Sequence, residues 1–197
     1  SGEKIIVATN NDSAYEMTVE LAGAGAAVTL LDARSSVPEK FSADLKGRGV
    51  ELRTGVAPLR AQGGHGVRAL TLAEADGSGW RESGTENCDL VLVSGGWSPV
   101  VNLLSHRGVK PRWDAENACF LPDDTTEPVI VAGSAAGIWR TGDCVVSGES
   151  AGLRAARALD RAAAEPSAPE PGGWLAPIRP LYEVRAPNRQ LKSFVDL

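Results

Sequence analysis

The residues best placed to bind a ligand lie in the turn after the first apolar segment. Residues 4–9 (KIIVAT) are rich in β-branched side chains, as in a buried strand, and a helical pattern begins at Ala14. A second apolar run ends at Asp32. A strand, a turn, a helix and a second strand, with an acid about 20 residues after the turn, are typical of a dinucleotide-binding Rossmann unit. Asp32 would accept hydrogen bonds from the ribose hydroxyls, which favours NAD over NADP.

The turn itself departs from the glycine pattern of such units. The three glycine positions of GxGxxG fall on Thr9, Asn11 and Ala14. Alanine is accepted at the third position, and asparagine adopts a left-handed backbone at modest cost. Thr9, however, carries a branched Cβ where the pyrophosphate must approach the backbone closely. A working NAD site and a Rossmann scaffold with a degraded or empty site therefore both stay open.

The elements around this turn are predicted from hydrophobic periodicity. A helix over residues 14–24, with Met17, Leu21 and Ala24 on one face, and a strand over 27–31 complete a βαβ unit. A second helix is predicted over residues 36–46, with Ser36 as its cap, and a third strand over 50–54. Three short segments then predict an antiparallel meander, over residues 56–62, 67–74 and 80–85.

The second half of the chain returns to longer apolar segments. Strands are predicted at residues 90–93 and 129–132, and a long helix from about Ser147 to Ala164. A proline-rich stretch over residues 166–180 predicts a linker or a surface strap, and residues 194–197 resemble the start of a strand.

Composition excludes several classes of function. A net charge of −5 without a basic run gives no electrostatic footprint for nucleic acid. No apolar run reaches the ~18 residues of a membrane span. The three cysteines form no CxxC, so neither zinc nor a redox dithiol is indicated, and a reducing, cytoplasmic setting is expected. His65 and His106 stand alone, and two isolated histidines make no metal site.

Three longer motifs carry a family resemblance. Residues 6–16 (IVATNNDSAYE) resemble the second dinucleotide domain of the two-dinucleotide flavoproteins, where this turn normally reads GGGDSA-E. The segment VATNNDSAY, the loop VSGGWSPVVNLLSHR at residues 93–107 and the closing FVDL together resemble the α subunits of heterotetrameric sarcosine oxidases. This second resemblance runs along nearly the whole chain.

The resemblance implies a fold and a set of boundaries. The expected fold class is α/β: a Rossmann-like nucleotide-binding domain with an antiparallel meander, plus the returning half of a second FAD/NAD(P)-binding-type domain. The inserted NAD-type domain would cover residues 2–87, the returning half 88–165, and a proline-rich strap with the start of a following segment 166–197. The first domain's own glycine motif would precede Ser1, and a folate-type domain would follow Leu197.

The resemblance also implies candidate binding residues. Those in the first βα turn and at the end of the second strand are Thr9, Asn10, Asn11, Asp12 and Asp32. Those in the later glycine-rich segments are Gly95, Gly96, Gly133 and Ser134, of which Ser134 stands where the family has an acid. No catalytic residue and no metal ligand is expected in this chain.

The implied function is that of part of an α subunit in a complex that oxidatively demethylates sarcosine, with tetrahydrofolate. NAD would bind this chain weakly or not at all, and the FAD and FMN of the parent complex are not expected here. Partners would be the other sarcosine oxidase subunits, and the chain alone would be inactive. It would either self-associate or fold with the support of the inserted domain alone. The alternatives are a stand-alone NAD-binding domain of the pyridine nucleotide-disulfide oxidoreductase type, the α subunit of a related proline or opine dehydrogenase, and a non-catalytic scaffold.

Overall fold

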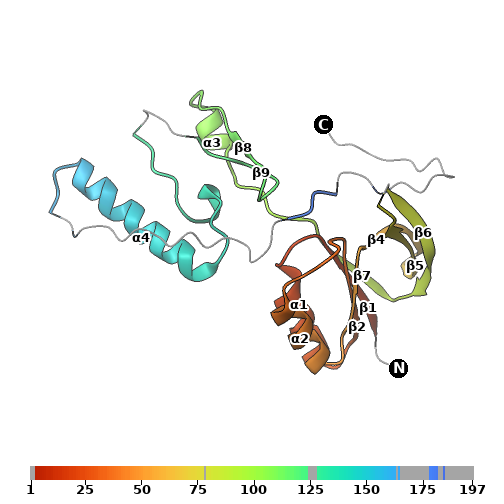
Figure 1. Ribbon diagram of the computed structural model, residues 1–197. Helices are drawn as coiled ribbons and strands as arrows, with labels where there is room; N and C mark the ends of the chain where they lie inside the picture. Colours follow the sequence, from red (N-terminus) through yellow and green to blue (C-terminus); the bar gives the residue numbers. More distant parts are fainter. Residues whose placement is uncertain are drawn as a thin grey trace. The chain divides into compact units, whose positions relative to one another are not determined.

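The computed structural model describes residues 3–77, 79–123, 128–162, 164, 178–181 and 184. They fall into two compact units. The first contains the described residues up to Gly96 together with residues 178–181 and 184, and the second begins at Trp97 (Figure 1).

A parallel sheet of four strands forms the centre of the first unit. The strand order is β3-β2-β1-β7, which places the first strand between the second and the last, as in half of a Rossmann fold. The register sets Thr9 opposite both Asp32 and Ser94, so the carboxyl ends of three strands meet at one edge. The strands are β1 (Lys4–Thr9), β2 (Ala27–Asp32), β3 (Glu51–Thr54) and β7 (Leu90–Ser94).

Two layers cover this sheet, one on each face. Alternation along β1 sends Ile5 and Val7 into one core with helices α1 (Ala14–Gly23) and α2 (Glu39–Gly47). Ile6 points the other way, into a core with the antiparallel sheet. Figure 1 shows the helices on one side of β1 and β2 and the antiparallel sheet on the other. That sheet has the order β4-β5-β6, formed by β4 (Val56–Gly63), β5 (Val67–Ala75) and β6 (Trp80–Asn87).

The predicted inner face of α1 is only partly correct. Leu21 packs against the core, but Met17 and Ala24 are exposed, and the helix buries Ala14, Tyr15 and Thr18. Thr18 tolerates burial because its hydroxyl donates to the carbonyl oxygen of Ala14 at 2.7 Å, so the helix itself satisfies this polar group.

The start of α2 also differs from the prediction. The helix begins at Glu39 with Pro38 as its N-cap, and Ser36 lies outside it. A proline disfavours helical backbone in the residue before it, so the helix does not extend back through Val37.

The first unit extends beyond the expected domain boundary at residues 87 and 88. β7 pairs with β1 over five residues, from Leu90 to Ser94, and the compact unit continues to Gly96. This pairing makes β7 part of the parallel sheet of the first unit.

The second unit contains little sheet. It comprises the short helix α3 (Asn102–Ser105), a hairpin of β8 (Arg112–Asp114) and β9 (Cys119–Leu121), the 3₁₀ turn η1 (Gly133–Ala136) and helix α4 (Thr141–Ala158). The predicted strand over residues 129–132 is absent, since none of the described strands pairs with it. α4 begins at Thr141, six residues before the predicted Ser147, with Asp143 in its first turn, where a carboxylate favours a helix N-terminus.

Two sequence predictions fall on other parts of the chain. The strand start at residues 194–197 and most of the strap over 166–180 lie outside the described residues; only residues 178–180 of the strap are described. Among the helices that the structure describes, none has the length and apolar character needed to cross a membrane.

Candidate functional site at the carboxyl edge of the parallel sheet

The side chain of Thr9 makes hydrogen bonds within the first βα turn and to the neighbouring strand. The residue is buried at the end of β1. Its hydroxyl lies 3.0 Å from the carbonyl oxygen of Asn11 and 3.1 Å from that of Ser94, and it accepts a hydrogen bond from the amide of Asn11 at 3.2 Å. The side chain therefore ties the turn to the neighbouring strand β7.

Asn11 fills the second glycine position with a fully buried side chain. Its Nδ2 donates to the carbonyl oxygen of Ser94 at 3.0 Å and to Oδ1 of Asn10 at 2.8 Å. Its Oδ1 accepts from the amide of Ser13 at 2.9 Å. The amides of Asn11 and Ser13 are thus bonded to side chains of the turn itself, whereas a Rossmann turn offers such amides to phosphate.

Ser13, the N-cap of α1, is drawn into the same network. Its hydroxyl makes no capping bond to the helix and lies 2.6 Å from the hydroxyl of Ser94. Ser94 thus contacts the turn through both its hydroxyl and its carbonyl oxygen.

Asp32 lies where the sequence predicts a ribose-binding acid, but its carboxylate is completely buried. Oδ1 accepts from the amide of Arg34 at 2.8 Å and from its Nε at 3.1 Å. Oδ2 accepts from the hydroxyl of Tyr15 at 2.7 Å and from Nη2 of Arg34 at 2.8 Å. Both oxygens therefore have two strong donors from the chain itself, which leaves no room for two ribose hydroxyls.

Arg34 links this acid to the turn. Its Nη1 lies 2.7 Å from Oδ1 of Asp12, so one buried guanidinium bridges Asp12 and Asp32. Burial alone lowers the pKa of Arg34, but the bonds to the two carboxylates outweigh it and raise the pKa. Asp12 directly precedes the N-cap of α1, so a carboxylate of the chain stands near where Rossmann units receive a pyrophosphate.

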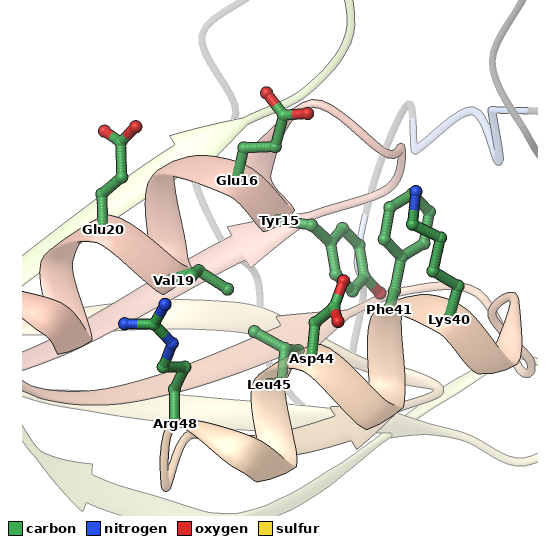
Figure 2. A pocket seen from close by; sticks show the side chains of 9 residues that line it. All are labelled: Tyr15, Glu16, Val19, Glu20, Lys40, Phe41, Asp44, Leu45 and Arg48. Carbon is green, nitrogen blue, oxygen red and sulfur yellow. The ribbon is translucent and has the colours of Figure 1, made fainter.

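Tyr15 is held in place from the helical layer. Its ring stacks on Phe41 with centroids 4.4 Å apart, at a groove of about 440 Å³ between α1 and α2 (Figure 2). Burial, followed by the hydrogen bond to Asp32, raises the pKa of the Tyr15 hydroxyl. The groove is rimmed by charged side chains of both signs, namely Glu16, Glu20, Lys40, Asp44 and Arg48.

The structure brings together only part of the predicted set. Thr9 and Asn11 share a hydrogen-bonded cluster with Ser94, and Arg34 bridges Asp12 and Asp32 in a second cluster beside it. Asn10 contacts Asn11 of the first cluster and donates its side-chain amide to the carbonyl oxygen of Arg179 at 2.9 Å. Gly95 and Gly96 directly follow β7 in the same unit.

Gly133 and Ser134 belong to the second unit. Gly133 has a φ of +59° and donates its amide to the Ser147 hydroxyl at 3.1 Å, so α4 and not a phosphate takes up this amide. Ser134 is exposed and lies in η1.

Sequence reasoning missed five residues that contact the candidate residues, namely Ser13, Tyr15, Arg34, Ser94 and Arg179. An arginine two positions after the predicted ribose acid was the available signal, because this short spacing lets a guanidinium neutralise the carboxylate. Tyr15, Ser94 and Arg179 carried no such signal, since their roles depend on tertiary contacts.

Neither metal nor dithiol chemistry has a place among the described residues. No group of three or more His, Cys, Asp or Glu side chains in that part of the chain could hold a metal ion. Burial raises the pKa of the Cys88 thiol and of the Cys119 thiol, which makes both poor nucleophiles.

Comparison with solved structures confirms the expected fold class. The chain is similar to the bacillithiol disulfide reductase of Staphylococcus aureus (TM-score 0.58, 18% identity, 80% of this chain and 50% of that one). It is similar to the thioredoxin reductase of T. acidophilum (TM-score 0.56, 14% identity, 80% of this chain and 52% of that one). It is also similar to the bacillithiol disulfide reductase of Bacillus cereus (TM-score 0.51, 21% identity, 68% and 42%). At these identities the likeness concerns the fold: a Rossmann-like α/β arrangement with an antiparallel sheet.

Comparison by sequence finds relatives whose identity to the chain is higher than that of the solved structures. No family model matches the chain. It is 35% identical over 186 residues to the sarcosine oxidase subunit alpha of Corynebacterium sp. strain P-1, and 33% identical over 188 residues to that of strain U-96, in each case over 90% of this chain. It is 31% identical over 202 residues, 99% of this chain, to the Rhizobium meliloti protein of the same name. The chain spans 19% of the length of each of these relatives. The resemblance seen in its motifs is thereby confirmed, and the chain belongs with the sarcosine oxidase α subunits as the counterpart of one region of them.

Proposed function

We propose that this chain is a scaffold region of the α subunit of a flavin-dependent amine oxidase complex that acts on sarcosine. Its Rossmann unit keeps the dinucleotide-binding architecture and contributes packing surfaces, while the first βα turn holds no dinucleotide. The substrate and the subunit context rest on the relatives, which are named as a subunit of sarcosine oxidase.

The observation that carries the scaffold role is that both carboxylate oxygens of Asp32 already accept hydrogen bonds from the chain itself. A carboxylate that is fully buried and bonded to Arg34 and Tyr15 does not fit the ribose of NAD, and the turn amides do not fit its pyrophosphate. The flavins and any NAD of the complex would then be held elsewhere in the assembly, outside the residues that form this cluster.

The second unit supports a role in assembly. Large apolar side chains are strongly exposed there, among them Val100 (69%), Leu103 (74%) and Leu159 (74%). Such surface favours association with another chain or segment. We propose that residues 97–162 form the returning half of a second FAD/NAD(P)-binding-type domain and that the isolated chain self-associates through this surface. Sedimentation would show oligomers, whereas a clean monomer at all concentrations would contradict the surface's role.

Three measurements test the functional proposal. The purified chain should be colourless, should form no hydrogen peroxide from sarcosine, and should bind NAD more weakly than about 1 μM, or roughly −8.2 kcal/mol, in calorimetry. An NAD-binding protein with an intact GxGxxG turn serves as the positive control. Peroxide formation from sarcosine by this chain alone would overturn the assignment, and tight NAD binding would overturn the scaffold role.

A further inference from the structure

A short segment far along the chain pairs with the first βα turn through its backbone. The amide of Arg179 donates to the carbonyl oxygen of Asn10 at 3.1 Å, and Nδ2 of Asn10 donates back to the carbonyl oxygen of Arg179 at 2.9 Å. Both polar groups of one peptide residue are thus bound by a single asparagine. We refer to residues 178–181 as the cover segment.

The side chain of Arg179 adds two further contacts. Its Nη1 donates to the carbonyl oxygen of Ala33 at 2.7 Å, and Ala33 itself is completely buried. Its guanidinium carbon lies 5.3 Å from the ring centroid of Trp80, the first residue of β6, within the range of a cation–π interaction. One arginine therefore joins the end of β2 to the antiparallel sheet.

The neighbouring Ile178 supplies an apolar anchor. It is only 5% exposed, and a Cβ added to Gly96 would lie 3.6 Å from its Cδ1. The backbone of Gly96 has a φ of +116°, which an L side chain rarely adopts. The cover segment is thus bound by polar groups at Arg179 and by apolar packing at Ile178.

Asn10 and Ala33, which bind the cover segment, lie where a Rossmann unit would bind its ligand. Asn10 and Ala33 directly follow Thr9 and Asp32, which are paired in the register of β1 and β2. The crevice beyond the carboxyl ends of these two strands is where a Rossmann unit receives its ligand. Asn10, a candidate cofactor residue by sequence, therefore uses its side chain to bind a peptide.

We propose that this edge of the sheet is a peptide-binding site and that its occupant is an arginine-bearing segment, residues 178–181 of this chain. The segment is recognised by the two hydrogen bonds between Asn10 and the Arg179 backbone, by the Ala33 carbonyl oxygen and by the face of the Trp80 ring. The proposal rests on the proposed function, because it gives this edge a peptide occupant in a Rossmann unit that holds no dinucleotide.

The test follows amide hydrogen exchange by NMR on the full chain. The Arg179 amide should be protected, and Arg179→Ala should speed its exchange about tenfold, which corresponds to about 1.4 kcal/mol, because two side-chain contacts are lost while the backbone pair stays. Trp80→Ala should act in the same direction to a smaller extent. Arg60→Ala, an exposed arginine on β4, is the matched control and should leave the rate unchanged.

The outcomes separate this inference from the proposed function. An unprotected Arg179 amide, or an exchange rate that Arg179→Ala does not change, overturns the cover segment even if NAD fails to bind. Protection that is lost when NAD is added would instead support the cover segment as a displaceable occupant and overturn the scaffold role. Far-ultraviolet circular dichroism confirms that each variant is folded, so that a change in rate reports the segment.

Discussion

Nη2 of Arg34 lies 2.8 Å from Oδ2 of Asp32, and both side chains are buried. This ion pair occupies the position at which a Rossmann unit binds ribose. The same guanidinium reaches Asp12 at 2.7 Å, so a single arginine connects the ribose position to the turn that would bind pyrophosphate. Arg34 is therefore the central residue of the closed site, although the altered glycine pattern is the more visible feature of the sequence.

Replacing Arg34 should strongly destabilise the first unit. Arg34→Met removes the guanidinium between two buried carboxylates, and breaking a buried pair in this way costs about 3–5 kcal/mol. Urea denaturation measures the free energy of unfolding. The matched control is Arg53→Met, whose partners Glu74 and Glu86 are partly exposed and whose loss should cost about 1 kcal/mol or less. Equal losses in the two variants would contradict the role given to Arg34.

The buried hydroxyl of Tyr15 should make stability depend on pH in the alkaline range. Its pKa is raised in the folded chain, whereas in the unfolded chain a tyrosine ionises near pH 10, at about its ordinary pKa. Below that pH both states are protonated and the stabilisation is complete. Above it the unfolded state releases a proton that the folded state retains, so stability falls by up to about 1.4 kcal/mol per pH unit.

Tyr15→Phe isolates this effect. The variant should be less stable than the original chain at pH 8, because a hydrogen bond to Asp32 is lost. The difference should shrink between pH 10 and 11, since phenylalanine does not titrate. A difference in the free energy of unfolding that stays constant from pH 8 to pH 11 would count against the buried hydrogen bond.

Restoring the glycine pattern should not restore a dinucleotide site. The double variant Thr9→Gly with Asn11→Gly recreates the first two glycines of the motif but leaves Asp32 bonded to Arg34 and Tyr15. It should lose about 1–3 kcal/mol of stability, because the bonds to the Ser94 carbonyl disappear. Calorimetry should still find NAD binding weaker than about 1 μM. Tight binding by this variant would mean that the glycine positions, and not Arg34, close the site.

The sequence predicted the first unit well because its elements are local. The apolar, β-branched run of residues 4–9 and the three short segments of the meander act over a few residues, and both predictions hold in the structure. The strand predicted at residues 129–132 failed for the opposite reason, since a strand needs a neighbour and apolar character alone does not supply one.

The sequence predicted where the candidate site lies, but not that its polar groups are bonded to other residues of the chain. The spacing from Thr9 to Asp32 located the carboxyl edge of the sheet, and the register of β1 and β2 confirms that these residues lie opposite each other. That Asp32 is neutralised by Arg34, and that Asn10 binds Arg179 from 169 residues away, depends on how the chain folds back on itself. Periodicity and spacing carry no information on such contacts.

Whether the chain's own side chains close the first βα turn is measured by an NMR titration with NAD. The amide signals of Asn11 and Ser13 report the turn, because both amides are bonded inside it. The closed site predicts that these signals, and that of the Arg34 amide, stay in place as NAD is added in large excess. Saturable shifts of all three signals with a common dissociation constant would contradict it.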